Sequence, residues 1–362
     1  MEHREKKVII VCPYPLNTAP SQRLKYEQYI DFLSKNGFKI DIHPFFSKST
    51  FKIIYKKGHI LKKIIGVLRG FYRRFLLLFK LSKYDGIYIH LNVCPVGPHI
   101  FEWFYLKLSR KTIYDIDDMV FLLSTSTNNK FASFLKSKQR YFFLMKKSNH
   151  CITCTPELDK IAKRFNNNTT DISSTINTDI YLPINKYSNS KEIVIGWTGS
   201  HSTVQYLYLL EEILQILARK YQFKLLVMGT KDFYIKGINT ECVQWNSEIE
   251  VNTLQRMDIG LYPLPDNDWI KGKSGLKALQ YMALGLPVVA SNLGCNSRVI
   301  ENNLSGLLVN NKEEWVDAIS KLIENNNLRK FLGTNARAKV EKYFSVNSNK
   351  NKYLSIFKNT YK

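Results

Sequence analysis

A Gly-Lys-Ser-Gly turn at residues 272–275 has the composition of an anion-binding site. A helical pattern of apolar residues begins directly after the turn, and Gly285 and Pro287 end that pattern before a short buried strand. Glycines let the backbone approach a ligand closely, and the unpaired N–H groups of a new helix point at it. The turn is therefore a candidate phosphate site, and a solvated helix start is the alternative interpretation.

Two lysines and a glutamine would extend this site. Lys273 lies in the turn itself, whereas Lys277 and Gln280 lie about one turn apart on one face of the helix. A P-loop is excluded, because its first glycine would be at position 267, where this chain has Asn267, and no strand pattern precedes it.

A second small polar loop follows the strand pattern at 193–197. Residues 198–203 read Thr-Gly-Ser-His-Ser-Thr, and a helical pattern runs from Val204 to Lys220. Glycine and serine at a helix start predict a second phosphate cradle. The loop contains no Arg or Lys, so its positive charge would have to come from Lys273 and Lys277.

Carboxylates end a predicted strand in the first half of the chain. The strand at 111–115 runs into Asp115, Asp117 and Asp118. Carboxylates at the carboxyl end of a strand could act as a base, contact an acceptor or hold a metal. Helix capping is the structural alternative.

The loop after the first predicted strand supplies two further polar residues. Ser21 is a plausible N-cap for a helix that runs to Lys35, and Arg23 follows it. A loop at the carboxyl end of a strand can contact a ligand, so both are candidates for an acceptor or phosphate contact. A helix cap and a solvated arginine explain them equally well.

Alternating strands and helices position all of these residues. The alternation predicts parallel α/β sheets with ligands at the carboxyl ends of the strands, and it restarts in the second half. A chain of 362 residues is long enough for two domains. The predicted division is 1–182, 183–345 and a final helix over 346–362.

The second half resembles GT-B-fold, retaining glycosyltransferases of the family 4 type. Their signature is a Glu, seven positions and a second Glu before a strand reading Pro-Val-Val, and the helix, the Gly-x-Pro turn and the strand match. Both acidic positions differ, since Gly272 and Gln280 occupy them. The chain looks like a bacterial branch of the family, and the resemblance is strongest from 193 to 310.

The resemblance implies an α/β GT-B fold with two Rossmann-like domains facing a central cleft. It implies a nucleotide-sugar donor held by the second domain, transfer with retention, no cofactor and no metal. The residues expected at the donor are Gly199, Ser200, His201, Ser202, Trp245, Lys273, Ser274, Gly275, Leu276, Lys277 and Gln280. A core position is the alternative for Trp245.

The resemblance also assigns the first domain to the acceptor. Asp117 and Asp118 take the place of a His-Asp pair that faces the sugar in many relatives, and with Lys273 they are the candidate catalytic residues. Ser21 and Arg23 are the candidate acceptor contacts. Gln280 would bond the ribose in place of the usual Glu.

The net charge of +23 points to an anionic partner. Residues 48–83 contain eleven Lys or Arg and no acid, and they include an amphipathic pattern from Ile60 to Lys80. A basic amphipathic helix with aromatics is typical of binding to an anionic membrane surface, and a helix packed on its own sheet is the alternative. Membrane contact would favour a lipid-linked or envelope saccharide as acceptor.

Several classes of protein are disfavoured. No apolar run approaches the ~20 residues of a membrane span. Six cysteines without a disulfide framework favour a cytoplasmic protein, and the basic helix would place it peripherally at the inner leaflet. A nucleic-acid binder would interleave exposed aromatics with basic residues along a groove, which the sequence does not predict. A sugar-nucleotide epimerase with the same fold remains the alternative enzyme.

Overall fold

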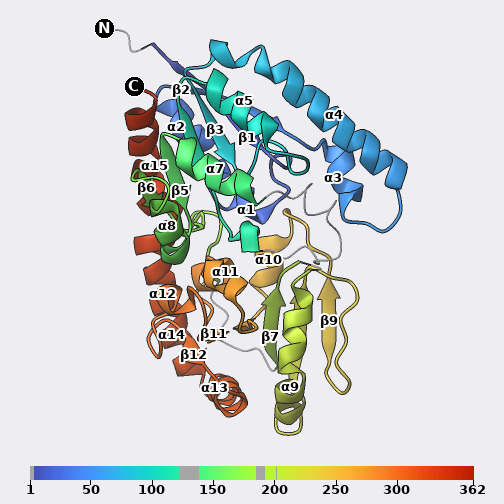
Figure 1. Cartoon of the computed structure of the whole chain (residues 1–362). Helices are drawn as coiled ribbons and strands as arrows, with labels where there is room; N and C mark the ends of the chain where they lie inside the picture. The colour runs from blue at the N-terminus through green and yellow to red at the C-terminus, as the bar shows by residue number, and fades with distance from the viewer. Residues whose placement is uncertain (1–3, 123–137, 185–191, 201) are drawn as a thin grey trace. The chain divides into compact units, whose positions relative to one another are not determined.

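The computed structural model describes residues 4–122, 138–184, 192–200 and 202–362, and the chain forms two compact units (Figure 1). Unit 1 comprises Met1–Ser174 with Lys350–Lys362, and unit 2 comprises Thr175–Asn349. The boundaries predicted from the sequence lie after residues 182 and 345. Each unit is a parallel sheet with helices packed against it.

Unit 1 contains a six-stranded parallel sheet in the order β2-β1-β3-β4-β5-β6. Its strands are β1 Lys6–Cys12, β2 Phe38–Pro44, β3 Gly86–His90, β4 Thr112–Asp115, β5 His150–Thr153 and β6 Thr169–Asp171. The central strands are buried on both faces, as parallel strands between helical layers must be. The chain order reverses between β1 and β3, so the topological switch point of unit 1 lies where these two strands end.

The helices of unit 1 are α1 Pro20–Arg23, η1 Tyr26–Tyr29, α2 Ile30–Lys35, α3 Lys48–Ile54, α4 Ile60–Leu78, η2 Leu81–Lys83, α5 Ile100–Leu108, η3 Val120–Leu122, α7 Gln139–Lys147 and α8 Pro156–Lys163. The single helix predicted from Ser21 to Lys35 is wrong. Pro20 opens α1 after Ala19, so Ser21 lies inside the helix and not at its N-cap. The sequence also predicts a helix over 129–147 from its apolar pattern; α7 forms its second half, and residues 129–137 lie outside the described residues.

The last helix, α15 (Val346–Thr360), supplies aromatic residues to the core of unit 1. Tyr353 stacks on Tyr29 with ring centroids 4.1 Å apart, and Phe357 packs edge-on against Phe38. Beyond the helix, the Tyr361 hydroxyl donates to the Ile87 carbonyl over 2.8 Å. The chain end is therefore part of the first unit's core.

Unit 2 contains a second six-stranded parallel sheet, in the order β12-β11-β10-β7-β8-β9. Its strands are β7 Ile193–Thr198, β8 Phe223–Met228, β9 Thr240–Val243, β10 Ile259–Tyr262, β11 Val288–Ser291 and β12 Leu307–Val309. Its helices are η4 Val204–Leu210, α9 Glu211–Ala218, α10 Glu250–Leu254, η5 Asp268–Gly272, α11 Leu276–Ala283, α12 Asn296–Val299, α13 Lys312–Glu324, α14 Asn326–Lys339 and η6 Val340–Phe344. The switch point of this sheet lies between β7 and β10.

Helix α4 buries two glycines, Arg74 and Leu77 against the rest of unit 1, while most of its large apolar side chains stay exposed. Gly66 and Gly70 are buried against Thr50 and Phe45. Arg74 is also buried, and its guanidinium donates to the carbonyls of Val93, His43 and Cys12 over 2.7 to 2.9 Å. The amphipathic pattern from Ile60 to Lys80 predicts Arg74 on the basic face opposite the apolar stripe, and this prediction is wrong. In Figure 1, α4 lies along the outside of unit 1, next to α3 and α5.

No helix among the described residues is long and apolar enough to cross a membrane.

Candidate active site

The two predicted phosphate loops meet at the switch point of unit 2. The loop after β7 begins at Gly199, and the segment after β10 leads through η5 to the turn at 272–275 and then to α11. Because β7 and β10 are neighbours in the sheet, both segments leave the same edge side by side. Loops 75 residues apart in sequence can therefore serve one ligand.

Lys277 joins these two segments. Its ammonium group lies 4.2 Å from the centre of the Trp197 ring and 3.3 Å from the Thr203 hydroxyl oxygen. A Cβ on Gly199 would lie 2.3 Å from the Trp197 ring and 2.8 Å from the Lys277 nitrogen, so the glycine lets both side chains approach the loop. The cation predicted to serve the Gly199 loop thus lies against that loop.

Lys277 forms no ion pair with a carboxylate among the described residues. Burial and the positive charge of Lys273 lower the pKa of Lys277 to about 7. The Trp197 ring and the Thr203 hydroxyl stabilise an ammonium less than a carboxylate would. A bound anion would supply the missing negative charge.

The Gly-Lys-Ser-Gly turn places Lys273 and the start of α11 close together. The Lys273 ammonium lies 3.6 Å from the centre of the Trp269 ring, which belongs to η5. Gly275 precedes α11 with a φ of +75°, a backbone conformation that favours glycine, and Leu276 begins the helix. Ser274, between them, is half-buried.

The loop after β7 is organised by its own hydroxyls. The Ser200 amide donates to the Thr203 hydroxyl over 3.1 Å, and the Ser200 and Ser202 hydroxyls lie 2.8 Å apart. The helix predicted over 204–220 is two elements, because η4 precedes α9. His201 lies outside the described residues.

Gln280 belongs to a buried hydrogen-bond network that the sequence did not predict. Its amide donates to Glu250 Oε1 over 3.1 Å and to the Tyr181 hydroxyl over 3.2 Å. Glu250 also accepts from Trp245 Nε1 over 2.9 Å and from the Tyr181 hydroxyl over 2.8 Å. Gln280 and Trp245, two predicted donor contacts, are therefore linked through a carboxylate that is 3% exposed. No motif pointed to Glu250, since it is 30 positions from Gln280.

In unit 1, Asp115 is buried and ion-paired, unlike Asp117 and Asp118 that follow it. Asp115 is fully buried and pairs with Lys25 over 2.5 Å and with His90 over 3.0 Å. Burial alone would raise the pKa of Asp115, but Lys25 and His90 hold it below its usual value. The Asp115 carboxylate is thus engaged by Lys25, His90 and Tyr88 inside unit 1, while the buried Nε2 of His90 has no hydrogen-bond partner among the described residues.

Asp117 and Asp118 are half-buried and lie just beyond that network. Lys25 donates to the Ile116 carbonyl over 3.3 Å, and the Cys154 thiol donates to the Asp117 carbonyl over 2.6 Å. Asp118 accepts from the Met119 amide over 2.8 Å, which is a local turn contact. Hydrogen bonds thus fix the backbone carbonyls of Ile116 and Asp117, and Asp117 lies two residues after the carboxyl end of β4.

Ser21 and Arg23 lie in α1, which follows the loop after β1. Both are half-buried, and β1 borders the switch point of unit 1. They lie in the expected part of the unit, and their contact with an acceptor remains a prediction.

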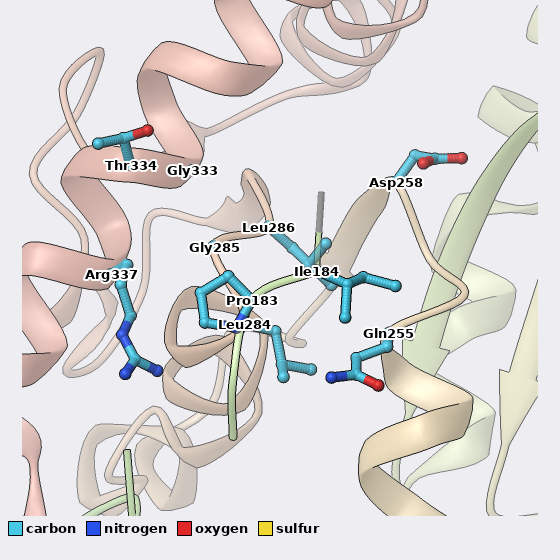
Figure 2. Close-up of a pocket in the computed structure, with 10 residues that line it drawn as sticks. All are labelled: Pro183, Ile184, Gln255, Asp258, Leu284, Gly285, Leu286, Gly333, Thr334 and Arg337. Atoms are coloured by element: carbon cyan, nitrogen blue, oxygen red, sulfur yellow. The ribbon is translucent and has the colours of Figure 1, made fainter. Parts of the chain in front are cut away.

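A shallow pocket of about 230 Å³ lies elsewhere on unit 2 (Figure 2). Asp258 and Leu286 line it just before β10 and β11, so it belongs to the amino ends of these strands. Pro183, Ile184 and the Arg337 side chain complete its wall in Figure 2. This pocket is therefore at the edge opposite the two phosphate loops.

No group of three or more His, Cys, Asp or Glu side chains that could hold a metal occurs among the described residues.

Residues 192–325 match the family model of group 1 glycosyl transferases. The matched segment lies in unit 2 and includes both phosphate loops. An uncharacterized glycosyltransferase of Methanocaldococcus jannaschii is 38% identical over 81 residues, which are 22% of this chain and 21% of that protein. D-inositol 3-phosphate glycosyltransferase of Paenarthrobacter aurescens is 37% identical over 71 residues, 19% of this chain and 17% of that one. The chain thus aligns with about a fifth of the length of these relatives.

Solved glycosyltransferase structures match the whole chain. Sucrose-phosphate synthase from Thermosynechococcus elongatus superposes with a TM-score of 0.70 at 14% identity, covering 98% of this chain and 99% of that one. HepE from Anabaena, in complex with UDP and glucose, superposes with a TM-score of 0.66 at 13% identity, covering 98% and 100%. At these identities the similarity concerns the fold, and it confirms the predicted α/β GT-B class. The family match supports the predicted glycosyltransferase enzyme.

Proposed function

We propose that this protein transfers a sugar, with retention, from a nucleotide-sugar donor to a lipid-linked or envelope saccharide. The donor diphosphate binds at the switch point of unit 2, between the loop after β7 and the start of α11. The observation that carries the proposal is the position of Lys277, a cation with no carboxylate partner among the described residues, against both segments. HepE structures contain UDP and UDP-glucose, which favours a donor of this chemical class.

Glycosyl transfer leaves a negative charge on the departing diphosphate. Preformed N–H groups and cations directed at that charge lower the barrier most effectively where water is excluded. The first N–H groups of α11, with Lys273 and Lys277, supply these donors. Asp117 or Asp118 acts on the sugar or the acceptor hydroxyl, and no metal or cofactor takes part.

The exposed face of α4 supports a membrane-bound acceptor. Large apolar side chains that are 42 to 76% exposed run along the helix: Ile60, Leu61, Ile64, Ile65, Leu68, Tyr72, Phe75 and Leu76. The alternative that this stripe packs on the protein's own sheet conflicts with these exposures. Lys62, Arg69 and Lys80 are exposed beside it. Apolar area together with cationic charge favours the surface of an anionic bilayer.

The donor assignment is tested with a panel of nucleotide sugars that varies base and sugar. We expect one donor class to raise the unfolding temperature of the protein, since a ligand that binds only the folded state stabilises it. With that donor, transfer to a lipid-linked saccharide should follow. If no nucleotide sugar stabilises the protein, the donor site is wrong.

The membrane assignment is tested by removing charge and leaving the apolar stripe intact. Lys62→Gln, Arg69→Gln and Lys80→Gln together should lower partition into anionic vesicles by roughly a hundredfold at low salt, at about 1 kcal/mol for each charge. The matched control changes Lys231, Lys236 and Lys330 to Gln, three exposed lysines of unit 2. Equal losses in both triple variants would contradict a role for α4.

A further inference from the structure

Helix α5 carries a second exposed apolar face beside α4. Ile100, Trp103, Phe104 and Leu108 are 38 to 53% exposed. The buried side of α5 is formed by Glu102 and Tyr105. The sequence predicts membrane contact only for the basic segment at 48–83, and α5 lies outside that segment.

The two helices form one surface. The rings of Phe71 on α4 and Phe101 on α5 lie 5.7 Å apart, and the Tyr105 hydroxyl donates to the Arg74 carbonyl over 2.8 Å. Figure 1 shows α5 next to α4 on unit 1. Phe101 and Tyr105 make this contact, while Ile100, Trp103, Phe104 and Leu108 of the same helix stay exposed.

The charge on this surface selects the occupant. Helix α4 contains no acid, and the one carboxylate of α5, Glu102, is fully buried near Arg140, 3.8 Å away. Lys107 lies over the Trp103 ring at 4.8 Å, and Lys111 follows the helix. Arg110, beside it, lies 3.8 Å from Asp85. A symmetric pairing of two copies would bring cations against cations. An anionic lipid surface complements them, and aromatic rings with neighbouring lysines suit the interface between headgroups and acyl chains.

We propose that α4 and α5 bind an anionic bilayer together, with Trp103 inserted at the interface. This inference rests on the proposed membrane-associated acceptor and extends it from one helix to a two-helix surface. Two inserted elements hold the orientation of unit 1 on the membrane more firmly than one. The acceptor would then reach unit 1 in a defined direction.

Trp103 provides its own probe. The other tryptophans, at 197, 245, 269 and 315, belong to unit 2. Vesicles of phosphatidylglycerol and acyl-chain-brominated phosphatidylcholine should quench part of the wild-type emission, and Trp103→Phe should remove most of that quenched part. Flotation without any Trp103-dependent quenching would overturn the insertion of α5.

A double variant measures the contribution of α5 to binding. Trp103→Gln with Phe104→Gln should lower partition into the same vesicles roughly tenfold, because two partly exposed aromatic side chains lose apolar burial. Phe331→Gln, at a half-exposed position on α14, is the matched control and should leave partition unchanged. Equal partition of the double variant and wild type would refute the proposal.

Two further measurements separate the possible failures. Light scattering of the purified protein should give a monomer, and a dimer that the double variant converts to monomer would assign this face to a second copy. Thermal stabilisation by the nucleotide sugar should be the same in the double variant as in wild type. If the nucleotide sugar stabilises neither the wild type nor any variant, the donor site is refuted and the membrane surface is not.

Discussion

Two lysines lie at the ligand-binding edges of two similar sheets and are held in opposite ways. Lys25 of unit 1 is buried and paired with Asp115 over 2.5 Å, so its charge is neutralised inside the protein. Lys277 of unit 2 lies over the Trp197 ring and forms no ion pair among the described residues. The first arrangement is complete without a ligand. The second becomes complete when an anion binds, and this difference separates a structural lysine from a binding lysine.

The largest effect is expected on the folding of unit 1. Lys25→Met would leave Asp115 buried without its cation, and breaking a buried ion pair in this way costs about 3–5 kcal/mol. Lys277→Met removes a cation that burial already disfavours, so stability should be unchanged or higher. Urea unfolding measures the free energy of unfolding of both variants. A similar loss of stability in Lys25→Met and Lys277→Met would contradict the distinction between the two lysines.

Anion binding should show the reverse order. Lys277→Met and Lys273→Ala should each lower affinity for UDP by about 1.5–3 kcal/mol, as expected for a charge-assisted contact. Lys271→Met is the control, because this exposed lysine pairs with Asp268 on the surface. Unchanged affinity in folded Lys277→Met would show that the donor diphosphate binds elsewhere.

The carboxylates of unit 1 offer a similar contrast. Asp117→Asn keeps the size of the side chain and lies outside the buried network, so stability should hold while turnover falls by at least tenfold. Asp115→Asn should instead lower stability, because Lys25 loses its partner. Steady-state rates together with unfolding curves check both. Turnover of Asp117→Asn within about twofold of wild type would remove Asp117 from the mechanism.

A smaller effect is expected from the buried Glu250 network. The Glu250 carboxylate accepts three hydrogen bonds, from Tyr181, Trp245 and Gln280. Glu250→Gln keeps the shape of the side chain but replaces the carboxylate by an amide, which should displace Gln280 and Trp245 and so weaken binding of the nucleotide sugar. Gln280→Ala should give a comparable loss, and the double variant should lose less than the sum because both act in one network. Strict additivity would show that the two residues act independently.

The sequence predicted most of the fold because buried strands are short apolar runs that need little context. It missed β6, whose three polar residues at the sheet edge follow an Asn-rich segment. It also assigned Arg74 to a solvated face, although Gly66 and Gly70 already marked the packed side of that helix. The network at Glu250 could not be predicted, because Tyr181, Trp245 and Gln280 are brought together only by the fold.

The sequence also indicated that Lys277 would serve the loop after β7, since that loop lacks a cation of its own. It could not indicate the state of that lysine. The lowered pKa depends on burial against Trp197 and on the nearby charge of Lys273, which are properties of packing. This state gives the most direct test of the donor site.

Proton uptake on binding tests the central claim, that Lys277 receives the donor diphosphate. In the folded protein the pKa of Lys277 is about 7, below the usual 10.5. Between these two pH values the unfolded chain therefore holds a proton on Lys277 that the ligand-free folded protein lacks, so the free energy of unfolding should rise with pH. A bound diphosphate raises the pKa again. Calorimetric titration of UDP, whose phosphates are fully ionised at pH 8, in buffers of different ionisation enthalpy should therefore detect proton uptake that Lys277→Met abolishes, with affinity falling from pH 7 to 9. Binding without proton uptake, or uptake that persists in Lys277→Met, would contradict the account.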